Sequence, residues 1–315
     1  MYNSVEELLE RAKTENKRLH EVIAQNEMSI SDISEEMLYD RLEKHYQTMV
    51  ASAAKAVNAP QDMPGVDFIK GQSLKQAQYS ESQTLGGSYL NNIMTMALSC
   101  CEVNAGMGRI CAAPTAGACG ILPAVLIETS RKLNSTKKEI LDALLVAAGF
   151  GAIFVRNSTV SGAEGGCQAE CGVAAAIAAA AAVYLAGGTA AMCANAVAIA
   201  VMNCMGLICD PVAGLVQVPC SFRNASQAAN AVASADLALA GQVSIIPPDE
   251  VIEAMYKVGK KMAPEFKETS QGGVAATPSW REKAFLRIEI NNVSFCQICK
   301  NDTTKCLKKK KGLTY

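Results

Sequence analysis

Three cysteines, Cys167, Cys209 and Cys220, stand among glycine, proline and small residues in segments 161–172 and 209–220. Glycine and proline here predict loops, in which the backbone can approach a bulky cofactor. Three thiolates can hold a cubane iron–sulfur cluster and leave one iron free for a ligand. An open iron polarises a hydroxyl group, so a neighbouring base need only remove a proton for water to be eliminated. The three cysteines therefore indicate a dehydration.

A second interpretation stays open, because the chain has 13 cysteines and an unligated cysteine usually behaves as a small buried hydrophobe. Gaps of 42 and 11 positions (167 to 209 to 220) match none of the compact ferredoxin patterns, so the spacing alone does not decide. Core packing is the expectation for the cysteines inside apolar stretches, which are Cys100, Cys101, Cys111, Cys119, Cys193 and Cys204.

Five ordered segments resemble one known family. The chain is similar to the alpha subunit of the iron–sulfur-dependent L-serine dehydratases from about residue 66 to about residue 278, and the matching segments are 102–123, 161–172, 209–220, 223–225 and 268–278. The resemblance implies conversion of L-serine to pyruvate and ammonia with a [4Fe-4S] cluster and without pyridoxal phosphate. It also implies that Cys167, Cys209 and Cys220 are the cluster ligands. Cys171 matches a position that is often not cysteine in relatives, but on a helix it would share a face with Cys167.

Segment 113–123 resembles the substrate-side loop of the family. Glycine and alanine leave backbone N–H groups accessible, Thr115 adds a hydroxyl, and the helix expected over 121–132 would favour a carboxylate at its N-terminus. An ordinary tight turn between two packed helices is the alternative. The predicted catalytic residues are Thr115 and Ser161, with the base expected on a partner subunit or on a side chain not yet identified. The predicted substrate-binding residues are Asn104, Thr115, Ala116, Gly117, Asn157 and Asn224.

The composition favours a mainly α fold with glycine-rich functional loops. Half of the 315 residues are hydrophobic and 19% are charged, and the net charge of −1 gives no reason to expect nucleic-acid binding. The charged N-terminus lacks the apolar core of a signal peptide. Many cysteines in a sequence without such a signal indicate a reducing cytoplasm. Segment 173–186 is shorter than the roughly 20 residues that cross a bilayer, and segment 190–208 carries Asn195 and Asn203, so both are expected to be core helices rather than membrane spans.

Apolar periodicity and turn residues predict the organisation of the chain. We expect a helical N-terminal segment (1–65), a catalytic domain of the serine dehydratase alpha type (66–280) and an atypical tail (281–315) whose lysine run suggests disorder. Ser135 or Thr136 and Asp249 are predicted helix caps, and His20 and His45 are expected to be solvated. The tail cysteines are three, Cys296, Cys299 and Cys306, and a structural zinc site needs four ligands, so a zinc site in the tail is not expected. The expected main helices span 90–102, 121–132, 137–153, 173–186, 190–205, 225–239 and 249–260.

The resemblance also implies a partner. Single-chain relatives have a separate domain with a Ser-His-Thr segment, which this sequence lacks, so a beta subunit of L-serine dehydratase is expected. Two alternatives remain open, an L-cysteine desulfidase-like lyase and a noncatalytic iron–sulfur subunit or sensor. A pyridoxal-phosphate enzyme is disfavoured because lysines are scarce between Lys138 and Val258 and no glycine-rich phosphate loop is evident.

Overall fold

The computed structural model describes residues 2–79 and 83–280, so the tail predictions for 281–315 lie outside the described residues. The described chain is mainly helical, as predicted, and its one pairing of β type is an isolated bridge between Cys209 and Lys267. The α-helices are α1 Val5–Thr14, α2 Leu19–Ser31, α3 Glu35–Asn58, α4 Gln72–Ala77, α5 Gly87–Ala105, α6 Ile121–Leu133, α7 Lys137–Asn157, α8 Gly162–Gly165, α9 Val173–Leu185, α10 Ala190–Cys204, α11 Cys220–Leu239 and α12 Pro248–Lys261. Short 3₁₀ turns are η1 Ala116–Ala118, η3 Val212–Gly214, η4 Pro264–Phe266 and η5 Gly273–Ala276, and η2 Gln168–Gly172 is a π-helix.

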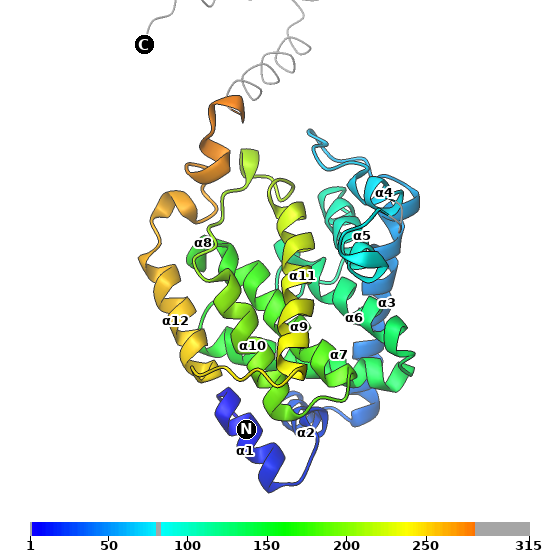
Figure 1. Cartoon of the computed structure of the whole chain (residues 1–315), viewed down its shortest axis with the longest axis vertical. Helices are drawn as coiled ribbons and strands as arrows, with labels where there is room; N and C mark the ends of the chain where they lie inside the picture. The colour runs from blue at the N-terminus through cyan, green and yellow to red at the C-terminus, as the bar shows by residue number, and fades with distance from the viewer. Residues whose placement is uncertain (1, 80–82, 281–315) are drawn as a thin grey trace, which may run out of the picture.

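Helix α9 lies at the centre, and α6, α7, α10 and α11 pack around it (Figure 1). Its alanines are small enough for close helix packing, and every residue from Val173 to Tyr184 is buried. By length and composition, the window Gln168–Leu185 is long and apolar enough to cross a membrane. The shorter segment 173–186 was expected to be too short to do so. Because 89% of this window is buried inside the protein, its apolar surface is already covered by neighbouring helices.

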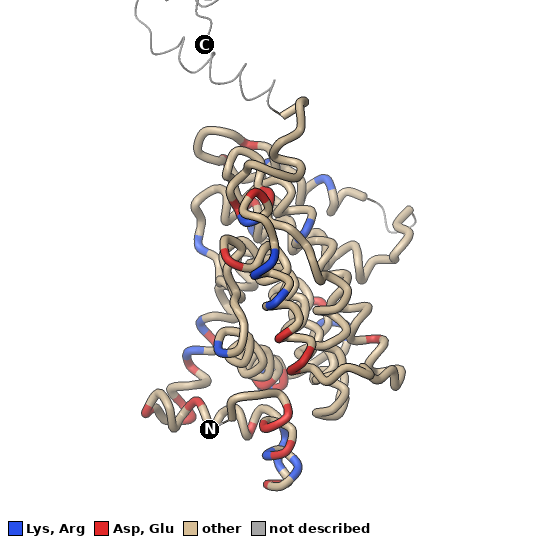
Figure 2. The backbone as a smooth tube through the Cα atoms, turned by 90° about the vertical axis from the view of Figure 1, so that its left-hand side faces the viewer, with Lys and Arg blue, Asp and Glu red and all other residues tan. Residues whose placement is uncertain are grey.

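The N-terminal helices share the core of the rest of the chain. Leu8 of α1, Val22 of α2 and Leu42 of α3 belong to the same buried cluster as Phe150 of α7. Local signals explain where these helices begin, because Ser4 caps α1 and Thr136 forms a capping box at α7. Figure 2 shows acidic and basic residues interspersed along the backbone.

Three local expectations were wrong. Helix α11 begins at Cys220 instead of residue 225, since Pro219 occupies the N-cap position and does not block the helix that follows it. His20 is buried, and its Nδ1 lies 2.6 Å from the hydroxyl of Tyr184. Asp249 does not cap its own helix, whose N-cap is Pro247.

Asp249 caps helix α1 instead. Its carboxylate accepts hydrogen bonds from the backbone N–H groups of Val5 (2.8 Å) and Glu6 (2.9 Å). We expect Asp249→Ala to lower the free energy of unfolding by about 1 kcal/mol, because the first turn of α1 loses its acceptor. Chemical denaturation would measure the loss. Glu250→Ala, an exposed neighbour in the first turn of α12, is the control, and equal losses in the two variants would contradict the capping role.

Candidate active site

The three predicted cluster cysteines come from three separate segments. Cys167 immediately precedes η2, Cys209 lies in the loop after α10, and Cys220 is the first residue of α11. Cys167 and Cys209 are only 3% and 4% exposed. Burial raises the pKa of Cys220 to about 12, with the charge of Cys167 adding to the effect, and the pKa of Cys209 is raised by burial and by the charges of Glu170, Cys167 and Cys220. The charge of Cys167 therefore acts on the pKa of both other thiols.

Cys167 differs from the other two thiols. A hydrogen bond from Cys171 lowers its pKa, the charge of Arg223 acts in the same direction, and burial opposes both. The expected pairing of Cys167 with Cys171 is therefore present, although the connecting turn is the π-helix η2 rather than an α-helix. Single π turns inside helical segments are frequent at functional sites.

Glycine is required where the segments approach one another. A Cβ atom at Gly162 would lie 2.5 Å from Glu170 Oε2 and 3.1 Å from Cys209 Sγ, and a Cβ at Gly172 would collide with Cys204 Sγ. The glycines around Cys167 thus allow the side chains of Cys204, Cys209 and Glu170 to pack directly against the backbone, where any larger residue would collide with them.

The side chains at this site that could bind a metal ion or a cluster are thiols. Within residues 2–79 and 83–280, no three His, Cys, Asp or Glu side chains are grouped to bind one metal ion. Ligands of a single zinc ion must all lie about 2.3 Å from it, whereas the cysteines of a cubane bind different irons and stand farther apart. The donors at this site are thiols, and glycine lets the backbone at residue 162 approach one of them, that of Cys209. The ligand roles of Cys167, Cys209 and Cys220 remain a prediction.

A buried ion pair orders the Cys209 loop. Arg223 Nη1 lies 2.7 Å from Asp210 Oδ1 and donates to the carbonyl of Ile208 at 2.8 Å, and Asp210 is 1% exposed. Asp210 Oδ2 also accepts a 2.7 Å hydrogen bond from the backbone of Val274 in η5. Asp210 and Arg223 were absent from the predicted site residues, although both lie inside the matching segments.

Backbone contacts bring the last matching segment, 268–278, to the same place. The N–H of Cys209 donates to the carbonyl of Phe266, and the N–H of Glu268 donates to the carbonyl of Cys209, both at 2.8 Å. This exchange is the isolated β-bridge of the fold. Segments more than 50 positions apart along the chain therefore meet at Cys209.

The predicted substrate loop is fastened to α11 by Asn224. This residue is completely buried, and its Nδ2 donates to the carbonyls of Gly117 (2.8 Å) and Cys220 (2.9 Å). Its Oδ1 accepts from the backbone N–H of Gly120 at 2.9 Å. The side chain thus links the start of α11, which carries Cys220, to the loop that precedes α6.

Two further hydrogen bonds hold the same loop. Asn104 Nδ2 donates to the carbonyl of Ala116 at 3.2 Å, and Thr115 Oγ1 donates to Glu170 Oε1 at 2.8 Å. The structure therefore brings five predicted residues together with the segments that carry the thiols, namely Asn104, Thr115, Ala116, Gly117 and Asn224.

Ser161 and Asn157 are placed differently. Ser161 is the exposed N-cap residue of α8 and directly precedes Gly162, which contacts the site. Asn157 is exposed at the end of α7, and its Nδ2 donates to the carbonyl of Asn3 at 2.7 Å. The structure thus connects Asn157 with the N-terminal segment, not with the hydrogen-bonded loop.

Glu170 was missed by the sequence reasoning. It is half-buried in η2, and burial raises the pKa of its carboxyl, with the charge of Glu268 acting in the same direction and the hydrogen bond from Thr115 opposing both. The Cys209 thiol lies 3.9 Å from its Oε2. The one available signal was its position three residues after Cys167.

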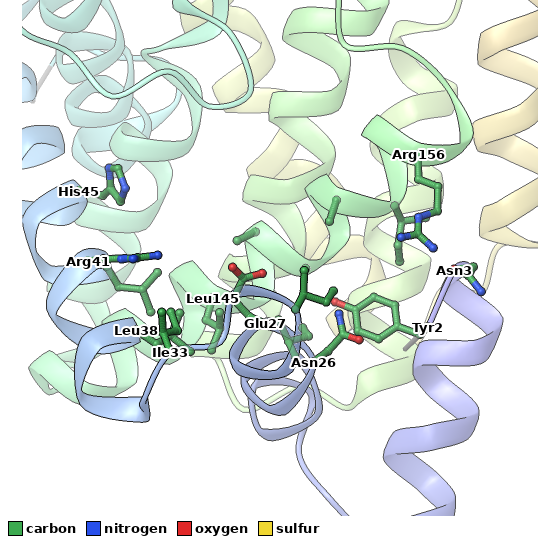
Figure 3. Close-up of a pocket in the computed structure, with 17 residues that line it drawn as sticks. Tyr2, Asn3, Asn26, Glu27, Ile33, Leu38, Arg41, His45, Leu145 and Arg156 are labelled. Carbon is green, nitrogen blue, oxygen red and sulfur yellow. The ribbon is translucent and has the colours of Figure 1, made fainter.

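A separate cavity of about 400 Å³ lies between α2, α3 and α7 (Figure 3). Tyr2, Glu27, Arg41 and Arg156 line it, and so does His45, which is exposed as predicted. None of the predicted site residues lines this cavity. It is distinct from the thiol site.

Fold and site together define a helical protein whose glycine-rich loops gather buried thiols and a carboxylate beside the start of α11. The family model "Serine dehydratase alpha chain" matches residues 14–275, and the chain belongs to that family.

Named relatives agree over most of the chain. The chain is 42% identical to a probable L-serine dehydratase alpha chain of Bacillus subtilis (strain 168), over 90% of this chain and 94% of that one. It is 41% identical to the L-serine dehydratase alpha chain of Peptoniphilus asaccharolyticus, over 88% and 95%. It is 38% identical to L-serine dehydratase 1 of Escherichia coli (strain K12), over 87% of this chain but 61% of that longer protein.

Proposed function

We propose that the protein is an L-serine ammonia-lyase, which converts L-serine to pyruvate and ammonia. The observation that carries the proposal is the family match over residues 14–275. The hydrogen bonds of Asn224 support it, since they join the start of α11, which carries Cys220, to the loop before α6. Relatives named L-serine dehydratase support the choice of substrate.

Cys167, Cys209 and Cys220 would hold a [4Fe-4S] cluster. When bound, such a cluster supplies an open iron that acts as a Lewis acid toward a hydroxyl group. The protein's own residues position the substrate: the loop 113–120 faces the carboxylate end, and Asn104 and Asn224 keep the loop in place. Thr115 and Ser161 are the hydroxyl groups proposed to contact the substrate or its leaving group.

We place the enzyme in a two-subunit assembly. This chain aligns with 61% of the longer Escherichia coli relative, and its family is named as an alpha chain. Both facts support a beta subunit that corresponds to the rest of the longer relative and supplies the base for the α-proton. The described cysteines are all free thiols, which supports a reducing compartment such as the cytoplasm.

Anaerobic co-purification with a cognate beta subunit tests the proposal. We expect about four irons and four sulfides per chain and pyruvate formation from L-serine that depends on both subunits. An iron-free protein, or a protein with iron and no turnover, would contradict it, and the latter result would favour the noncatalytic iron–sulfur subunit.

Competition separates the two lyases. With L-serine and L-cysteine supplied together, the dehydratase is expected to form pyruvate without sulfide. Preferential release of sulfide would instead identify an L-cysteine desulfidase-like lyase, since the two substrates differ in the leaving group alone.

A further inference from the structure

Glu170 is a carboxylate in a site made largely of thiols. Thr115 Oγ1 binds one carboxylate oxygen at 2.8 Å, and the Cys209 thiol lies 3.9 Å from the other. Among the described residues no Lys, Arg or His forms an ion pair with it, and Arg223, the cation of the site, is paired with Asp210 at 2.7 Å.

Two glycines let the backbone pack closely against this carboxylate. A Cβ at Gly117 would lie 3.1 Å from Oε1, and a Cβ at Gly162 would lie 2.5 Å from Oε2. Both positions therefore require glycine, because a larger residue would displace the carboxylate from its place against the substrate loop and beside Cys209.

A half-buried carboxylate gains most from a cation that a ligand supplies, because desolvation is costly when the charge is unpaired. The ammonium group is the positively charged group that the backbone of every amino acid carries. The carboxylate of the ligand would be repelled by Glu170 and by the nearby charge of Glu268.

We propose that Glu170 binds the α-ammonium group of the substrate, so that it is the residue that selects an amino acid over the corresponding hydroxy acid without nitrogen. Thr115 is its positioning residue, because the 2.8 Å hydrogen bond fixes the carboxylate between the substrate loop and Cys209. The identity of the amino acid as L-serine rests on the proposed function, whereas the recognition of an ammonium group does not.

Two unreactive probes that differ by the ammonium group alone test the role. L-Alanine and propanoate both lack the leaving hydroxyl, so their binding to the anaerobic holoenzyme can be titrated by calorimetry without turnover. We expect Glu170→Gln to weaken L-alanine binding about 10- to 100-fold, as loss of a charge-assisted hydrogen bond predicts, and to change propanoate binding less than about threefold. Iron and sulfide content should match the unaltered enzyme.

Glu164→Gln is the matched control. Glu164 also accepts a 2.8 Å hydrogen bond from a threonine, Thr159, but it has its own cation in Lys260 at 2.6 Å. The Glu164→Gln variant should leave the ratio of the affinities for L-alanine and propanoate unchanged. Thr115→Val keeps the carboxylate and removes its support, so we expect a smaller loss of L-alanine binding, and this variant serves if Glu170→Gln does not fold.

Three results would overturn the inference: equal weakening of both probes, loss of iron in Glu170→Gln, or loss of turnover with L-alanine binding intact, which would make Glu170 the proton acceptor. Failure of the proposed function looks different. An unaltered holoenzyme that binds L-alanine through Glu170 but releases no pyruvate from L-serine would refute the lyase and leave the ammonium site standing.

Discussion

Cys167→Ala is expected to lower the iron content from about four per chain to near zero and to reduce turnover of L-serine at least about 1,000-fold. Cys167 is almost fully buried at the start of η2, and the charge of Arg223 favours its thiolate, which is the form that binds metal. Anaerobic iron and sulfide analysis, with the visible absorbance of the cluster, measures the loss. Cys209→Ala and Cys220→Ala should behave alike.

Cys193→Ala is the control for packing. Cys193 is completely buried in α10, and its pKa is raised to about 12 by burial, with no contribution from the other cysteines. Both substitutions delete one buried sulfur, so they should cost similar stability, but Cys193→Ala should keep its iron. Full iron in Cys167→Ala would remove this residue from the ligand set and with it the mechanism built on three thiols.

The helices were predictable because their signals are local. Apolar periodicity located α6, α7, α9 and α10 to within a few residues, and Thr136, one of the two predicted candidates, caps α7. The resemblance to a family identified the cysteines and the substrate loop as candidate site residues. The structure adds the hydrogen bonds by which Asn104 and Asn224 hold that loop, and the sequence alone did not show these contacts.

The misses involve partners that are distant in sequence. Asp249 caps a helix 244 positions away, and His20 is buried against Tyr184, 164 positions away, so no local pattern reveals either contact. Glu170 stands out only when Thr115 and Cys209 are folded against it. The π turn of η2, which places Glu170 there, has no recognisable local signature in Gln168–Gly172.

Asn224→Ala is expected to lower the free energy of unfolding by about 3 kcal/mol and kcat/KM by about 100-fold. The stability loss follows because the N–H of Gly120 and the carbonyls of Gly117 and Cys220 lose their partner in a buried place. The activity loss follows because a shift of about 1 Å in a substrate-positioning loop can cost that much. Denaturant unfolding and steady-state kinetics measure the two effects.

Asn230→Ala is the control on the same helix, since its half-buried amide is also extensively hydrogen-bonded but has no partner in the substrate loop. Its partners are the carbonyl of Ala200 (3.1 Å) and the side chains of Asn203, Gln227 and Ser234. This variant should also lower the free energy of unfolding, by about 1 to 2 kcal/mol, and leave activity intact. Asn224→Asp separates the two halves of the side chain, because it keeps the acceptor for Gly120 but turns an oxygen toward two carbonyls. It should be at least as damaging as alanine. If Asn224→Asp instead retained activity, the link between α11 and the loop would depend on the Gly120 contact alone, and the substrate loop would be held by Asn104 and Thr115.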